Sequence, residues 1–292
     1  MSLSFAKPTT RTIIRTLIPI GTALLAFVVT GFLLLAGGFD PLEAYGLILQ
    51  GSIGGVREGG ETLVRTTSLL LTGLAVGFAF RCKIWNIGAE GQLYFGAIGA
   101  VVIALTVVGQ IPVFGIIIAI IFAMIFGAGW AAIAGVLKSR LGVNEIIVTV
   151  MLNFIAILFV DFLVHGALKA PGFEPQTALI PLTSQLPILI EGTRLHAGFL
   201  VAIAAAVLIY LILFKTKTGF SLRATGVNPK ASGYAGINVK RSILLTLLIS
   251  GAVAGIAGAC LVQGVNDRLL VGISPGYGFI AIIIALLGRE HP

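Results

Sequence analysis

The chain has 292 residues, of which 58% are hydrophobic and only 10% are charged, and its mean hydropathy is +1.09. An ordinary soluble domain carries about 25% charged residues, and a soluble fold could not hide this much apolar surface from water. The composition therefore excludes a soluble enzyme, a disordered chain and a nucleic-acid-binding protein. It indicates an all-α bundle that crosses a membrane several times.

Apolar segments follow one another along the whole chain and predict about eight membrane segments, because about 20 apolar residues cross the hydrocarbon core as a helix. The first segment is too long for a signal peptide and has no clear cleavage site, so we expect it to stay. The last is a broken or re-entrant half-helix, or a span cut short, because it is too short to cross alone. The expected segments are 13–36, 63–80, 92–108, 112–137, 146–165, 198–214, 242–262 and 277–287.

The positive charges give the expected orientation. The net charge is +8, and 14 of the 19 Lys and Arg residues fall on the side of the N-terminus when Arg289 is counted there. Positive residues collect in cytoplasmic loops, so this partition predicts a cytoplasmic N-terminus and explains the basic composition without nucleic acid. Two long outer loops, 37–62 and 166–197, contain Pro and Gly residues that predict ordered turns.

No catalytic or metal-binding motif is found. The sequence has no phosphate-binding loop, no H-E-x-x-H, no G-x-S-x-G and no Cys/His cluster, and its three histidines are scattered. We therefore expect no enzyme activity, no metal and no cofactor in this chain. The two cysteines, Cys82 and Cys260, are expected to be small buried hydrophobic residues rather than a disulfide.

The inner loop 215–241 contains signals for one short helix. Asn228 is a favoured N-cap residue, Pro229 suits the first helical position and Gly236 suits a left-handed C-cap, so a helix is expected over 229–235. Such a capped element favours a docking helix for a partner over an idle loop. The expected docking residues are Arg223, Asn228, Pro229, Lys230, Ala231, Tyr234, Ala235 and Gly236.

Two further segments place polar residues at membrane depth. In 81–92, glycines interrupt the apolar pattern around Asn86, Glu90 and Gln92; the alternative is a solvated surface turn with Glu90 near Arg81 and Lys83. In 144–153, three polar residues at i, i+4 and i+8 share one helix face that should point into the bundle. These three residues are Glu145, Thr149 and Asn153.

A path for an uncharged solute through such a bundle would need aromatic faces with amide and hydroxyl partners. The expected substrate-path residues are Asn86, Glu90, Gln92, Thr149, Asn153 and Tyr277, with Tyr94, Phe95, Gln263 and Asn266 offering similar chemistry. Asp161 is either a path-lining or an interfacial group.

Four stretches resemble the permease subunits of bacterial ABC importers, in the branch related to ribose and branched-chain amino-acid permeases that is assigned to nucleosides or simple sugars. They read IWNIGAEGQLYFGAIGA, VNEIIVTVMLNFIA, LRATGVNPKASGYAGINVKRSILLTLLISGAVAGIAGA and SPGYGFIAIIIALLGR, within roughly residues 72–289. The loop 223–237 looks like the family's coupling helix, which docks into the ATPase subunit.

The resemblance implies a single transmembrane permease domain, 1–292, that moves a nucleoside or simple-sugar-like solute inward by alternating access. The implied partners are ABC ATPase subunits that use ATP, an extracytoplasmic substrate-binding protein, and a second identical or related permease subunit. The alternative is a secondary carrier or channel not coupled to ATP, although the ionisable pairs expected of a carrier are missing. Family members usually continue beyond ALLGR, so the chain is either a fragment or a permease without its last helix or two.

Overall fold

The computed structural model describes residues 10–291, with side chains from Gly21 onward. Regular structure in this range is helical, and the only β-type pairings among the described residues are two isolated bridges, Gln176 with Leu270 and Ile188 with His196. The chain divides into two compact units, Met1–Gly59 and Gly60–Pro292. Lys7, which is part of the positive-charge count, lies outside the described residues.

The first unit contains α1 (Thr10–Ala36) and α2 (Pro41–Ile53), which are bent by 118° at the break between them. The break follows from local chemistry: Gly38 has a φ of +82°, and the Asp40 carboxylate accepts a hydrogen bond from the Leu42 amide as the N-cap of α2. The prediction of an outer loop over 37–62 is therefore wrong for most of its length, because it overlooked an N-cap followed by proline.

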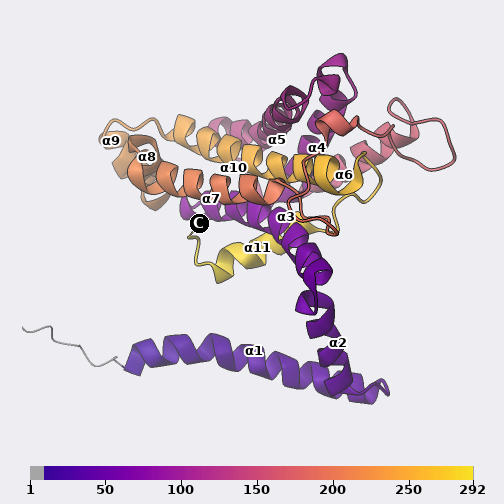
Figure 1. Ribbon diagram of the computed structural model, residues 1–292. Helices are drawn as coiled ribbons and strands as arrows, with labels where there is room; N and C mark the ends of the chain where they lie inside the picture. Colours follow the sequence, from indigo (N-terminus) through magenta and orange to yellow (C-terminus); the bar gives the residue numbers. More distant parts are fainter. Residues whose placement is uncertain (1–9, 292) are drawn as a thin grey trace, which may run out of the picture. The chain divides into compact units, whose positions relative to one another are not determined.

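The second unit forms a bundle around α10, which Figure 1 shows packed beside α4 and α5. The elements of the remaining chain are α3 (Val56–Arg81), α4 (Ala89–Ala104), η1 (Val107–Gln110), α5 (Phe114–Leu141), α6 (Glu145–His165), η2 (Leu182–Ser184), α7 (Gly198–Lys215), α8 (Lys217–Val227), α9 (Pro229–Tyr234), α10 (Val239–Leu261), the π-helical η3 (Val262–Asn266) and α11 (Tyr277–Leu287).

The predicted count of about eight membrane segments is not confirmed. Within the described chain, five helices are long and apolar enough to cross a membrane, namely α3, α5, α6, α7 and α10 with its extension, and the bent pair of the first unit makes up to six. The segments expected at 92–108 and 277–287 are the short apolar helices α4 and α11. A helix of 16 residues such as α4 is about 24 Å long, which is less than the hydrocarbon core of about 30 Å.

The loop 166–197 is ordered, as its Pro and Gly residues predict. It is tied to the end of α10 by backbone hydrogen bonds, including Leu186 N to Gln263 O at 2.7 Å and Ile180 N to Asp267 O at 2.9 Å. His196 is buried in this loop, and burial lowers its pKa to about 4. The imidazole is therefore neutral near pH 7, and its Nδ1 accepts a hydrogen bond from the Gly198 amide.

Glycines allow the backbones of the central helices to approach one another closely, as small residues do between membrane helices. A Cβ at Gly96 of α4 would lie 2.4 Å from the Gly255 Cα of α10, and one at Gly127 of α5 would lie 2.3 Å from the Gly251 carbonyl oxygen. Gly251 and Gly255 thus let α10 pack closely against α4 and α5. The interior of the bundle depends on the absence of side chains at these positions.

Two glycines on α5 offer a matched test. We expect Gly127→Ala to destabilise the protein by about 1–3 kcal/mol, because the new methyl group would overlap the α10 backbone. Gly129→Ala should be neutral or slightly stabilising, because nothing lies within 4 Å of its Cβ and alanine favours a helix. Thermal unfolding in detergent measures both. Equal melting of the two variants would show that close α5–α10 packing is unimportant.

Candidate functional site

The candidate site is built around a break in the helical path, the broken segment 82–88 between α3 and α4. The chain leaves α3 through Lys83, which has a φ of +57°, and enters α4 at Gly88, which offers no side-chain cap. Backbone groups that are freed at such a break and buried away from water must each find a partner in the protein. The buried polar side chains of this region supply those partners.

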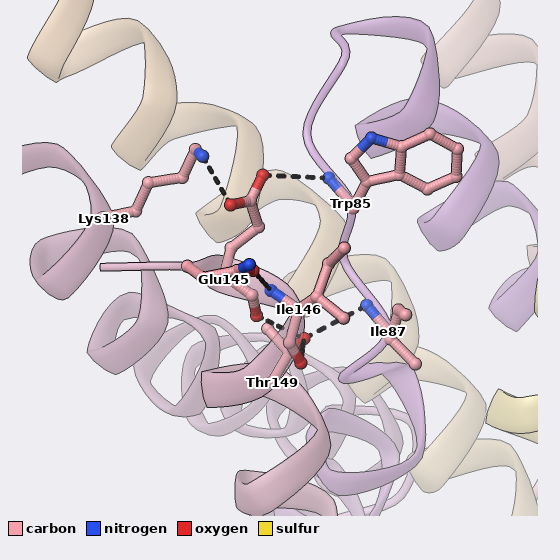
Figure 2. A network of polar contacts seen from close by, with 7 residues as sticks. Trp85, Ile87, Lys138, Glu145, Ile146 and Thr149 are labelled. Atoms are coloured by element: carbon pink, nitrogen blue, oxygen red, sulfur yellow. Dashed lines mark hydrogen bonds and ion pairs between the residues drawn. The ribbon is translucent and has the colours of Figure 1, made fainter. Parts of the chain in front are cut away.

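The polar face of α6 lies against the broken segment (Figure 2). The Glu145 carboxylate accepts a hydrogen bond from the Trp85 amide at 3.4 Å, and the Thr149 hydroxyl accepts one from the Ile87 amide at 3.3 Å. Both side chains are buried. Glu145 also pairs with Lys138 of α5 at 2.5 Å, which compensates its charge. The prediction that this face points into the bundle is confirmed.

Asn153, one turn further along α6, also binds the chain around the broken segment. Its Oδ1 accepts a hydrogen bond from the Gly91 amide at 2.8 Å, and its Nδ2 donates to the Ile87 carbonyl at 2.8 Å. The side chain is fully buried. One amide side chain therefore replaces both a missing acceptor and a missing donor of the backbone.

Asn86 and Gln92 form a second buried pair. The Asn86 Nδ2 donates to the Gln92 Oε1 at 3.0 Å and to the Ser250 hydroxyl of α10 at 2.8 Å, while the Gln92 Nε2 donates back to the Asn86 Oδ1 at 3.0 Å. The Ser250 hydroxyl donates in turn to the Ala75 carbonyl of α3 at 2.6 Å. These side chains join α3, α4 and α10 through contacts within the chain.

Glu90 anchors the half-helix α11. Its carboxylate accepts a hydrogen bond from the Gly278 amide at 2.6 Å, and the side chain is only 1% exposed. The Ser274 hydroxyl accepts hydrogen bonds from the Gly276 and Tyr277 amides beside it. A carboxylate at the N-terminus of a helix also interacts favourably with the helix dipole. Glu90 therefore fixes the position of a helix that lies 188 residues away in sequence.

The alternative of a solvated turn with Glu90 near Arg81 and Lys83 is wrong, because the carboxylate is buried against α11. Lys83 pairs instead with Glu290, with the Lys83 Nζ 3.2 Å from the Glu290 carboxylate. Tyr277 differs from the other five substrate-path candidates: it is half-buried and lines a cavity of about 430 Å³.

The remaining polar and aromatic candidates lie elsewhere in the bundle. Phe95 stacks on Trp130 with ring centroids 3.7 Å apart, and Gln263 donates to the Ser184 carbonyl in the loop 166–197. Asp161 lies at the exposed end of α6, 3.4 Å from His165. Sequence reasoning missed the pairing of Lys138 with Glu145 and the roles of Ser250 and Gly278. The pairing of Lys138 with Glu145 could be found from the sequence, because the two opposite charges flank one short turn. The roles of Ser250 and Gly278 leave no signal in the neighbouring sequence.

The loop 215–241 forms two helices, of which α9 is the predicted one. The Asn228 side chain caps α9 by accepting a hydrogen bond from the Ala231 amide at 3.0 Å, and Gly236 follows with a φ of +82°. The helix ends at Tyr234, one residue before the predicted end, and the Tyr234 side chain is 94% exposed. The preceding helix α8 is not among the predicted elements.

Contacts link the loop 215–241 to the broken segment. A Cβ at Gly226 of α8 would lie 2.2 Å from the Cys82 carbonyl oxygen, so the two backbones touch. Arg223 is half-buried with its guanidinium 5.0 Å from the Phe214 ring centroid, so it is not part of the exposed α9 surface. Asn228 and Ala231 border a groove of about 470 Å³ between α8 and α9.

Neither a disulfide nor a metal cluster is present among the described residues. Cys82 and Cys260 are free and buried, as expected from the sequence. Burial raises the pKa of the Cys82 thiol to about 11, so this thiol is protonated and unreactive near pH 7.

The two hydrogen bonds of the Asn153 side chain lead to a stability prediction. Asn153→Leu should destabilise the protein strongly, because it leaves the Gly91 amide and the Ile87 carbonyl without partners at about 1–3 kcal/mol each. Met151→Leu is the control, because Met151 is 55% exposed on the same helix. The thermal midpoints of the two variants in detergent should differ by several degrees. Equal midpoints would show that the Asn153 amide does not stabilise the protein.

Comparison with known proteins identifies the family to which this chain belongs. Residues 60–292 match the family described as "Branched-chain amino acid transport system / permease component". The chain is 37% identical to the guanosine ABC transporter permease protein NupP of Bacillus subtilis, over 93% of this chain and 79% of that protein. It is 35% identical to the glucose ABC transporter permease protein TsgB13 of Haloferax volcanii, over 93% and 74%.

A more distant relative is the guanosine ABC transporter permease protein NupQ of Bacillus subtilis, 29% identical over 79% of this chain and 75% of that protein. No solved structure matches. The family match covers most of the chain, and several apolar helices are long enough to cross a membrane. The chain is a multi-pass membrane protein that belongs to the family of permease components of branched-chain amino acid transport systems.

Proposed function

We propose that the chain is the permease subunit of an ATP-binding-cassette importer that moves a nucleoside or simple-sugar-like solute inward by alternating access. The printed names of relatives at 35–37% identity support the solute class, since one is a guanosine and one a glucose permease. The observation that carries the coupling to ATP is α9, a capped helix whose Tyr234 side chain is almost fully exposed. The chain acts as one permease domain, 1–292, with 215–241 as its coupling loop.

ATP hydrolysis belongs to partner ATPase subunits, since this chain has no phosphate-binding loop. The docking surface consists of Tyr234 with Ala231 and Ala235, and Lys230 forms a charged rim; all four are exposed. An exposed aromatic residue beside small apolar residues is typical of the centre of a protein–protein contact.

Movement of α9 would reach the membrane helices through the contacts described above. Gly226 touches the Cys82 carbonyl, so a displacement of α8 and α9 acts on the broken segment. That segment is bonded to α6 through Asn153, and Glu90 just beyond it holds α11. In this proposal the ATPase cycle shifts α4 and α11 together, because their ends share one set of hydrogen bonds.

The complete importer contains an extracytoplasmic substrate-binding protein and a second permease subunit, in contact with membrane lipid. Two Bacillus subtilis permeases, NupP and NupQ, carry the same printed solute and match this chain at 37% and 29% identity. This pairing favours a heterodimer of two related permeases over a homodimer. The Lys and Arg partition supports a cytoplasmic N-terminus in a bacterial inner membrane.

Reconstituted transport tests the proposal. In proteoliposomes that contain the permease, its ATPase subunits and its binding protein, we expect ATP-dependent uptake of guanosine or glucose. Tyr234→Asp should weaken binding of the ATPase about tenfold or more and abolish uptake, because losing a central aromatic contact costs about 2 kcal/mol or more. Tyr234→Phe is the matched control and should retain both activities.

Two outcomes would contradict this account. Uptake by Tyr234→Asp at the wild-type rate, with the ATPase still bound, would show that α9 is not the coupling element. Uptake driven by an ion gradient without the ATPase would instead support a secondary carrier.

A further inference from the structure

A cavity of about 430 Å³ lies between the N-terminal half of α3, the end of α10 and the start of α11. Its volume falls within the range of small-molecule sites, about 300–1,000 Å³. Val64, Arg65 and Ser68 line it from α3, and Tyr277 and Ile280 line it from α11. The orientation proposed above places this cavity on the outer side of the membrane.

Three polar groups in the cavity have free hydrogen-bonding capacity. The Arg65 guanidinium, the Ser68 hydroxyl and the Tyr277 hydroxyl have no hydrogen bond or ion pair in the part of the chain that the structure describes. The rim is different: Arg194 binds Glu61 through two hydrogen bonds of 2.6 Å. The rim charges therefore compensate each other, and Arg65 is left to interact with a ligand.

Asn86, Gln92 and Asn153 do not have this free capacity. The side chains of Asn86, Gln92 and Asn153 are buried and bonded within the chain, so a solute could bind them only by breaking those contacts. Replacing such bonds gives little net free energy. The free groups on the cavity wall are better placed to bind a solute.

The residues that line the cavity suit one chemical class of ligand. The Tyr277 ring, with Leu69, Val265 and Ile280, offers an aromatic and apolar surface for a planar heterocycle. The guanidinium donates hydrogen bonds in a fixed fork that suits carbonyl oxygens and ring nitrogens, and the two hydroxyls can both donate and accept. An uncharged nucleoside combines a planar base rich in acceptors with ribose hydroxyls.

We propose that this cavity binds the transported solute, an uncharged nucleoside, and that Arg65 is a specificity-determining residue. The inference rests on the proposed importer function and adds the location and the recognition chemistry of the solute. It replaces the buried candidates in and around the broken segment with a path along α3, α10 and α11.

Thiol labelling tests the cavity without relying on uptake. Leu69→Cys places a thiol in the cavity, and Leu189→Cys places one in the outer loop, where Leu189 is 41% exposed. Both native cysteines are buried, which keeps the background low. The variants are expressed with the ATPase subunits, and spheroplasts are treated with a membrane-impermeant methanethiosulfonate. The solutes added are uridine, inosine, glucose or inorganic phosphate at millimolar concentration.

We expect uridine and inosine to slow the labelling of Leu69→Cys about fivefold or more, and to leave Leu189→Cys unchanged. Adding Arg65→Gln should abolish the protection, whereas Arg268→Gln, which removes a cation outside the cavity wall, should preserve it. Tyr234→Cys should stay unlabelled from outside, as the proposed orientation requires.

The outcomes separate the two proposals. If the reconstituted wild type takes up a nucleoside but no nucleoside protects Leu69→Cys, the cavity proposal is overturned and the importer function stands. Protection by glucose or phosphate alone would overturn the assignment to nucleosides. If the reconstituted wild type takes up none of these solutes, the proposed function fails and the cavity proposal fails with it.

Discussion

The structure depends on one constraint: a backbone N–H or carbonyl that is buried away from water must find a partner within the protein. The chain interrupts its helical path at 82–88 and meets this constraint with side chains. Thr149 and Asn153 of α6 bind the freed groups at Ile87 and Gly91, and Glu90 binds the first turn of α11. Polar residues that would be costly in lipid therefore hold the bundle together, and they leave little capacity for a solute.

The same contacts give the bundle a connected interior. Close packing of α4, α5 and α10 over facing glycines leaves no room for independent movement of these helices. The loop 215–241 touches the broken segment at Gly226, and α11 is held by Glu90. A force applied at α9 would therefore act on a unit that moves as a whole, which is the behaviour that alternating access requires.

Local signals predicted part of this arrangement. The caps of α9 could be predicted because the capping residues adjoin the helix in the sequence. The shared face of Glu145, Thr149 and Asn153 follows from helical periodicity. The partners of these residues could not be predicted, because Asn153 and Gly91 are separated by 62 positions and Glu90 and Gly278 by 188. Such contacts depend on how the helices pack, and a sequence pattern records only that a residue is polar and inward-facing.

Hydrogen–deuterium exchange of the folded protein in lipid nanodiscs tests the central claim most directly. The amides of Trp85, Ile87 and Gly91 have side-chain acceptors although the helix is interrupted around them. We expect peptides covering 84–91 to exchange far more slowly than the exposed residues 171–174 of the loop 166–197. Equally rapid exchange in the two segments would show that the break is open to water and that side chains of α6 do not hold it.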